Sequence, residues 1–228
     1  MIGVYDYTVI LTYLSTISGV IGIIITMTGI GHPYCGTLFL MVSGLLDGFD
    51  GKVARTKKNR TEFEKKFGIE IDSFSDLICF GILPTSIGMA QLRVNGTLTE
   101  LERGNRPDNY ALILLLMSIA VFYVLAALVR LAYFNSTVEE RAEEAKERGK
   151  EYYTGLPVTA SALIFPLTLV LHWILNANLT IFYFWLLFIV GLFFVSNLKV
   201  PKPNKKQFAV IITIGFIELI AILCILFG

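Results

Sequence analysis

The amino-acid sequence predicts an all-α, polytopic transmembrane helix bundle of about seven spans, within a range of six to eight. Its 228 residues are 55% hydrophobic and 16% charged, with a mean hydropathy of +0.68, whereas soluble domains carry about 25% charged residues. The apolar residues fall in long blocks close to the ~20 residues that cross a hydrocarbon core. Basic residues gather between these blocks. The pattern excludes a water-soluble globular protein, a disordered chain and a disulfide-stapled secreted domain.

Seven apolar blocks provide the predicted spans. The segment before the first block lacks the basic region of a signal peptide, so we expect this block to be retained in the membrane. The second and third blocks contain several charged residues, and each of the others contains at most one. In chain order the blocks cover residues 8–30, 34–55, 68–92, 109–134, 155–175, 179–197 and 207–227.

The placement of lysine and arginine predicts the orientation. With seven spans, three connecting segments on one side hold 13 basic residues, against three in the long loop on the other side. Basic loops face the cytoplasm, which predicts a cytoplasmic N-terminus and cytoplasmic loops at 56–67 and 135–153. The charged run 138–150 is expected to form a solvated helix or hairpin. Because no repeat or linker interrupts the chain, we expect a single membrane domain over residues 1–228.

Four aspartates lie in the second and third spans, where a carboxylate facing lipid costs at least about 2.5–3.5 kcal/mol. Asp47 and Asp50 share one helical face, and Asp72 and Asp76 share another. Two antiparallel helices would bring these pairs together near one leaflet. Divalent cations that prefer oxygen ligands, namely Mg²⁺, Mn²⁺ or Ca²⁺, would resolve the repulsion, and the lack of His and Cys ligands argues against zinc.

The remaining unusual residues receive simpler interpretations. The three cysteines are interpreted as small core residues and the two histidines as interfacial residues near the outer side. Glu218, in the last span, is expected to make an interhelical hydrogen bond or to be protonated. The net charge of +1 gives no reason to expect a nucleic-acid partner. The residues in question are Cys35, Cys79, Cys224, His32 and His172.

Small residues surround the first aspartate pair, and two interpretations are open. Gly44, Gly48, Gly51 and Ala54 could form a seam for close helix packing. They could instead leave room for a phosphate-bearing ligand against the backbone. Beside the aspartates and Arg55, a pyrophosphate site is the better interpretation.

The sequences DGFDGKVAR (47–55) and GIEIDSFSD (68–76) resemble the motif of the CDP-alcohol phosphatidyltransferase family, D-x-x-D-G-x-x-A-R followed by G-x-x-x-D-x-x-x-D. The spacer has twelve residues instead of the usual eight, and we expect the extra length to leave the helix faces intact. The segments 130–135, 154–162 and 195–201 resemble the phosphatidylserine synthase branch of the family, with Tyr133 where a second arginine is common. All eight fixed positions of the motif are present: Asp47, Asp50, Gly51, Ala54, Arg55, Gly68, Asp72 and Asp76.

The resemblance implies transfer of a phosphatidyl group from CDP-diacylglycerol or CDP-archaeol to L-serine, with release of CMP. It also implies two Mg²⁺ or Mn²⁺ ions, with Ca²⁺ as a further candidate, and a homodimer in the membrane. Asp76 stands at the general-base position. The implied metal ligands are Asp47, Asp50, Asp72 and Asp76. The implied CDP-lipid contacts are Asp47, Asp50, Gly51, Ala54, Arg55 and Gly68.

For the acceptor, we predict that Arg130 receives the serine carboxylate or a phosphate, with Asn135 as a polar partner. The alternative is an interfacial arginine that extends toward water. Glycerol 3-phosphate or an inositol phosphate would be acceptors for the same chemistry, but each should demand more basic residues. A cation transporter is the alternative from another class, and it would favour acids at mid-membrane.

Overall fold

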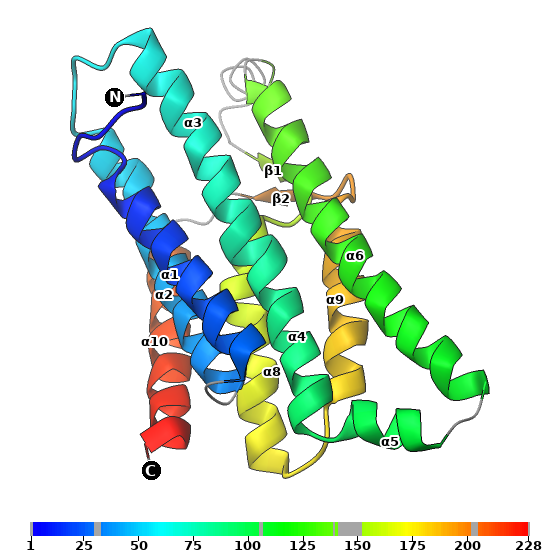
Figure 1. Ribbon diagram of the computed structural model, residues 1–228. Helices are drawn as coiled ribbons and strands as arrows, with labels where there is room; N and C mark the ends of the chain where they lie inside the picture. The colour runs from blue at the N-terminus through cyan, green and yellow to red at the C-terminus, as the bar shows by residue number, and fades with distance from the viewer. Residues whose placement is uncertain are drawn as a thin grey trace.

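The computed structural model describes residues 2–29, 33–104, 107–138, 140, 152–201 and 205–227. The predicted helical bundle is confirmed (Figure 1). Most of the predicted loop 135–153 and of the charged run 138–150, together with His32, lies outside the described residues. The helices are α1 (Ile10–Thr28), α2 (Pro33–Ala54), α3 (Glu62–Asp76), α4 (Leu83–Val94), α5 (Thr97–Arg103), α6 (Pro107–Ser136), α8 (Ser161–Leu175), α9 (Thr180–Phe194) and α10 (Lys205–Phe227).

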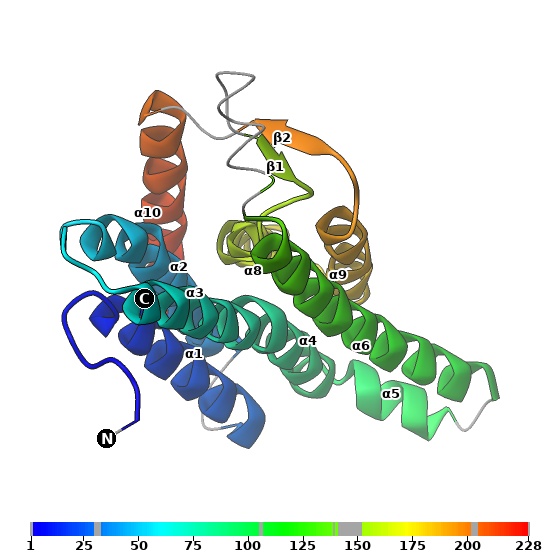
Figure 2. The ribbon, with the colours of Figure 1, turned by 90° about the horizontal axis from the view of Figure 1, so that it is seen from above.

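The chain runs back and forth between two ends of the bundle. At one end lie the α2–α3 connection, the C-terminal end of α6 and the N-terminal end of α10; we call it the α2–α3 end (Figure 1). The α8–α9 connection and the C-terminus lie at the opposite end. Figure 2 shows α10 at the side of the bundle, where it packs on α2 and α8.

Five of the described helices are long and apolar enough to cross a bilayer, which supports an integral membrane protein. The two remaining predicted spans are helical but do not meet that criterion. Helix α9 is apolar but has only 15 residues, and α2 carries Asp47, Asp50 and Lys52 near its end. Seven spans therefore stays a prediction. The five qualifying segments are Ile10–Thr28, Glu62–Val94, Asp108–Ser136, Val158–Leu175 and Ala209–Leu226.

The third predicted span is one continuous helix that contains a π-helical segment. The segment η1 (Leu77–Ile82) joins α3 directly to α4. Pro84 has no N–H to donate to the Phe80 carbonyl four residues earlier. The buried Tyr123 hydroxyl of α6 donates to that carbonyl at 2.8 Å. A cross-helix hydrogen bond therefore replaces the helical one at the bundle core.

Two short strands, which the sequence did not predict, close the base of the α8–α9 hairpin. Strand β1 (Tyr152–Thr154) pairs antiparallel with β2 (Lys199–Pro201). Beyond β1, Gly155 has a φ of +78° and donates its N–H to the Leu198 carbonyl at 2.7 Å. A Cβ at Gly155 would lie 2.8 Å from the Phe194 carbonyl oxygen, so only glycine fits there. The short 3₁₀ turn η2 (Val158–Ala160) then leads into α8.

Candidate active site

Three aspartates converge between α2 and α3 at the α2–α3 end. Carboxylate oxygens of Asp47, Asp50 and Asp72 all lie within 4.8 Å of one another. Helix α2 supplies the first two from one face, and α3, which runs back along it, supplies the third (Figure 1). The sequence spacing predicted this meeting of the two faces.

Asp76 lies one turn beyond Asp72. Its carboxyl is within hydrogen-bonding reach of Asp47, and the Asp72 carboxyl is within reach of Asp50. Asp76 stands outside the compact group formed by the other three. All four predicted carboxyls are therefore neighbours, but only three have oxygens placed to share one ion.

Thr12 of α1 is a site residue that the motif did not reveal. Its hydroxyl donates a hydrogen bond to Asp50 Oδ2 at 2.9 Å, and both side chains are buried. The Ser75 hydroxyl of α3 donates to the Thr12 carbonyl at 3.3 Å. Thr12 thus fixes one oxygen of Asp50 and links α1 to α3, the helix that carries Asp72.

A signal for Thr12 exists in the sequence. The buried residues of α1 are all small or polar, at spacings of three, one and four residues that keep them on one helical face. In membrane helices such residues mark the interface, because they let backbones approach and hydroxyls bond across helices. They are Thr12, Ser15, Ser18, Gly19, Gly22 and Thr26.

The hydroxyl contacts continue below the aspartates. The Ser15 and Ser43 hydroxyls each donate to the other's carbonyl, at 3.3 and 3.1 Å, which joins α1 to α2. The fully buried Cys79 thiol of η1 donates to the Ser15 carbonyl at 3.2 Å. A Cβ at Gly19 would lie 2.5 Å from Cys79 Sγ. The backbones of α1, α2 and η1 therefore pack closely together next to the aspartates.

The small residues of α2 divide between the two interpretations. A Cβ at Gly44 would lie 2.5 Å from Ala162 Cβ, so Gly44 serves helix packing. A Cβ at Gly48 would meet nothing within 4 Å. At Gly51 it would meet only the Arg55 guanidinium, 3.4 Å away. The packing interpretation therefore fits Gly44, and the open-space interpretation fits Gly48.

The second half of the twelve-residue spacer (56–67) forms the beginning of α3. Thr61 caps α3 through reciprocal bonds with Glu64, which form a capping box. Lys57 Nζ lies 2.6 Å from a carboxylate oxygen of Glu64 and 2.6 Å from one of Asp6, in the segment before α1. Lys57 lowers the pKa of Asp6 to about 2. We call Asp6, Lys57, Thr61 and Glu64 the spacer clasp.

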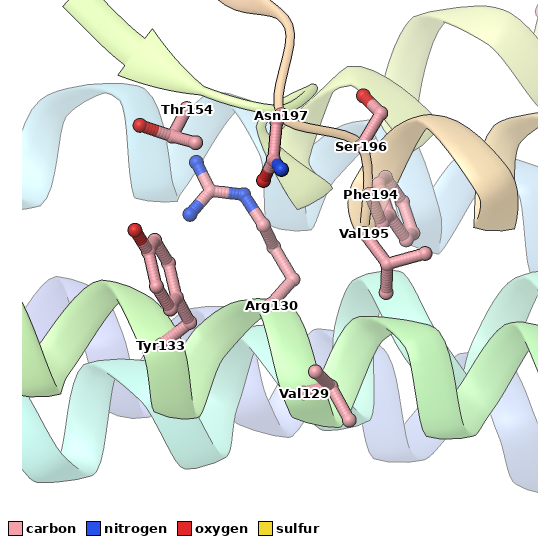
Figure 3. A pocket seen from close by; sticks show the side chains of 8 residues that line it. All are labelled: Val129, Arg130, Tyr133, Thr154, Phe194, Val195, Ser196 and Asn197. Atoms are coloured by element: carbon pink, nitrogen blue, oxygen red, sulfur yellow. The ribbon is translucent and has the colours of Figure 1, made fainter.

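Arg130 borders a separate pocket at the same end of the bundle. The pocket has a volume of about 100 Å³, and Figure 3 shows the side chains of α6, β1 and the end of α9 around it. Arg130 is 5% exposed, and its Nε donates to the Leu156 carbonyl at 3.3 Å. Its guanidinium also lies over the Phe134 ring, 5.4 Å from the centroid. The lining residues are Val129, Arg130, Tyr133, Thr154, Phe194, Val195, Ser196 and Asn197.

The structure does not bring Asn135 into this pocket. Asn135 exchanges hydrogen bonds with Ser73 of α3, at 3.0 and 3.2 Å, beside Asp72. The two residues are five positions apart on α6 and face different neighbours. Asn135 therefore ties α6 to the helix that carries Asp72, while Arg130 faces the pocket.

The donor set fits a divalent cation that prefers oxygen. Three carboxylates from two helices supply hard anionic ligands, and no described histidine lies among them. Glu218 is not part of this group; it is buried in α10, and its Oε2 has no hydrogen-bond partner among the described residues. The interhelical hydrogen bond predicted for Glu218 stays a prediction.

Comparison with known proteins identifies a family and several relatives. The model of the family CDP-alcohol phosphatidyltransferase matches residues 8–196. CDP-diacylglycerol–serine O-phosphatidyltransferase of Helicobacter pylori strain 26695 is 26% identical over 181 residues, which are 77% of this chain and 65% of that protein. The protein of the same name from Saccharomyces cerevisiae is 32% identical over 160 residues, 68% of this chain and 50% of that protein. That of Methanocaldococcus jannaschii is 28% identical over 208 residues, 90% of this chain and 77% of that protein. The chain thus spans just under two thirds of the Helicobacter relative and half of the yeast relative.

Proposed function

Because the chain belongs to the CDP-alcohol phosphatidyltransferase family, we propose that it transfers the phosphatidyl group of a CDP-activated lipid to L-serine. The lipid would be CDP-diacylglycerol or CDP-archaeol. The products would be CMP and a phosphatidylserine or archaetidylserine. The observation that carries the proposal is the convergence of Asp47, Asp50 and Asp72 within a motif whose eight fixed positions are all present.

Asp47, Asp50 and Asp72 would hold the divalent metal, with Mg²⁺ and Mn²⁺ as the preferred ions, Ca²⁺ as a further candidate and two ions as the expected number. When bound, such ions neutralise the diphosphate charge and polarise its oxygens. Without them, three carboxylates would face an anionic substrate. The support for this role is the chemistry and spacing of the three donors.

We assign the general base to Asp76. The serine hydroxyl attacks the lipid-bearing phosphorus, the bond from that phosphorus to the CMP oxygen breaks, and the hydroxyl proton passes to the base. Asp76 is adjacent to the three-aspartate group and outside its compact set of oxygens. A carboxyl in that position can accept a proton while its neighbours keep the metal.

The remaining motif residues would hold the CDP-lipid. Arg55 offers charge-assisted hydrogen bonds to the diphosphate, and its guanidinium lies beside Gly51. The open space at Gly48 leaves room for a ligand close to the α2 backbone. Ala54 and Gly68 keep the adjoining helix surfaces free of large side chains.

The acceptor would bind in the Arg130 pocket, with the serine carboxylate on the guanidinium. Thr154, Ser196 and Asn197 offer polar atoms for the rest of the amino acid. Arg130 is the only cation among the residues that line the pocket, which favours serine over an acceptor with a phosphate. A cation transporter is disfavoured because the acids lie close to the α2–α3 end.

We further propose that the α2–α3 end faces the cytoplasm at the cell membrane and that the protein is a homodimer. The orientation is supported by the lysines and arginines of the spacer at this end. The homodimer is supported by family resemblance alone. A single membrane domain over residues 1–228 is part of the same proposal.

The test is CMP release by the purified protein supplied with a CDP-lipid, L-serine and Mn²⁺ or Mg²⁺. We expect release that needs serine and metal, and its loss in Asp76→Asn and Asp47→Asn. Glycerol 3-phosphate and an inositol phosphate serve as competing acceptors. CMP release with either of them and none with serine would overturn the acceptor assignment. Cation flux into liposomes without CMP release under any condition would favour the transporter.

A further inference from the structure

We propose that Arg60, in the lengthened spacer, binds the cytosine of the CDP-lipid and selects it over uracil. The inference rests on the proposed function, because it names a nucleotide contact of the same site. Arg60 is outside the eight-position motif, and it precedes the Thr61 cap of α3.

The Arg60 side chain folds back along α3 toward the motif. Its Nη2 donates to the Glu64 carbonyl at 3.1 Å. A Cβ at Gly68 would lie 2.7 Å from the same Nη2. Gly68, Asp72 and Asp76 succeed one another at intervals of four residues, which keeps them on neighbouring parts of one helix face. The guanidinium therefore lies against Gly68, which is one helical turn before Asp72 on α3.

The spacer clasp holds Arg60 in that place. The capping box fixes Thr61, the next residue, and the Lys57 ion pairs anchor the chain on the other side of Arg60. The guanidinium is thus preorganised, which reduces the ordering cost of any ligand contact.

The donors of Arg60 are not all used within the chain. Its Nε is buried and has no hydrogen-bond partner in the described part of the structure. A buried donor without an acceptor carries a free-energy cost that a ligand acceptor would remove. This observation, with the position of the guanidinium against the motif residue Gly68, indicates a ligand that brings hydrogen-bond acceptors to the guanidinium.

Cytosine has the matching edge. Its O2 and N3 are adjacent acceptors, and a guanidinium presents N–H groups in a rigid fork. Uracil carries a hydrogen on N3, which would face the same donors without an acceptor. The diphosphate would lie deeper, at the aspartates, so the nucleoside reaches the level of Gly68 and Arg60.

The experiment measures equilibrium binding of CMP and of UMP to the purified full chain, with no reaction needed. We expect Arg60→Ala to weaken CMP binding about tenfold and UMP binding less than twofold, so that the preference for CMP falls. Arg60→Lys keeps the positive charge but lacks the paired N–H groups of a guanidinium. We therefore expect this variant to bind CMP as weakly as Arg60→Ala does. Lys58→Ala is the matched control, an exposed cation of the same loop, and should bind like the unaltered protein.

Thermal unfolding of each variant checks that the fold is retained. An equal loss for CMP and UMP would overturn the base contact in favour of a phosphate contact. Unchanged CMP binding in Arg60→Ala would overturn the inference while leaving the proposed function in place. Failure of the unaltered protein both to bind CMP and to release it from CDP-lipid would overturn the proposed function as well.

Discussion

At the scale of single residues, Thr12 determines how Asp50 meets a cation. The Thr12 hydroxyl donates a hydrogen bond to Asp50 Oδ2 from a third helix, and this bond fixes the orientation of the Asp50 carboxylate beside Asp47 and Asp72. Partners of this kind orient metal ligands, and their loss commonly costs 10–100-fold in metal affinity.

We therefore expect Thr12→Val to weaken Mn²⁺ binding by at least about tenfold, measured by titration with detection of free Mn²⁺ by electron paramagnetic resonance. Thr12→Ser keeps the hydroxyl and should restore most of the affinity. Thr28→Val, at an exposed position of the same helix, is the control. Equal Mn²⁺ affinity in Thr12→Val and the unaltered protein would contradict the positioning role.

The glycines of α2 give a second residue-scale prediction. Gly44→Ala places a methyl group 2.5 Å from Ala162 Cβ, and overpacking of this kind costs about 1–3 kcal/mol. Gly48→Ala meets nothing within 4 Å and should leave thermal stability unchanged while it raises the KM for the CDP-lipid. A loss of stability in Gly48→Ala as large as in Gly44→Ala would show that both glycines serve packing.

At the scale of elements, the spacer clasp makes the α2–α3 connection sensitive to acid. The pKa of Asp6 falls to about 2 in the folded protein from an ordinary value of 3.8. The ion pair therefore stabilises the fold fully above about pH 4 and loses its contribution as the pH falls toward 2. The pKa of Lys57 is raised above 10.5, so the contribution persists at neutral and mildly alkaline pH.

Asp6→Asn should consequently lower the Tm in detergent at pH 6, and the difference from the unaltered protein should close between about pH 4 and pH 2. Asp6 and Lys57 are 29% and 27% exposed, so the effect at pH 6 is at most about 2–4 °C. Glu70→Gln removes an exposed carboxylate of α3 and should show no such closing difference. A Tm difference that stays constant down to pH 2 would count against the ion pair.

The sequence predicted elements where composition alone decides them. Each of the seven apolar blocks became a helix because a backbone in lipid must satisfy its own hydrogen bonds. It did not predict η1 or the hydrogen bond from Tyr123 to the Phe80 carbonyl, because that bond joins two helices that are distant in sequence. The β1–β2 pairing joins segments nearly fifty residues apart, and local sequence carries no signal for such a pair.

The sequence predicted the motif residues of the candidate site, but not the residues that depend on contacts between separate elements. The motif spacing places Asp47, Asp50 and Asp72 on facing helices, and the structure brings them together. Asn135 shows the limit: it is near Arg130 in sequence, yet it bonds to Ser73 of α3 because five residues along a helix turn the side chain to another side. Thr12 and Arg60 depend on contacts between separate elements, which a motif does not contain.

At the scale of the whole molecule, the two ends of the bundle differ in their number of basic residues. The spacer at the α2–α3 end has five lysines and arginines, whereas at the other end the α8–α9 connection has none and the long loop before α6 has three. This asymmetry predicts that the aspartates open toward the cytoplasm.

A membrane-impermeant maleimide tests the orientation. We expect Ala177→Cys to react in intact cells and Lys58→Cys to react only after the membrane is opened, since the two exposed positions lie at opposite ends. The unaltered protein reports the reaction of its three native cysteines. Labelling of Lys58→Cys in intact cells, with Ala177→Cys protected, would reverse the assigned orientation.

The β1–β2 ladder has a mechanical consequence. By pairing the segment before α8 with the segment after α9, it closes the open end of the α8–α9 hairpin. Thr154 and Asn197, at the two sides of this closure, are therefore held close to each other by backbone hydrogen bonds. The wall opposite Arg130 thus keeps its shape through the backbone as well as through side-chain packing.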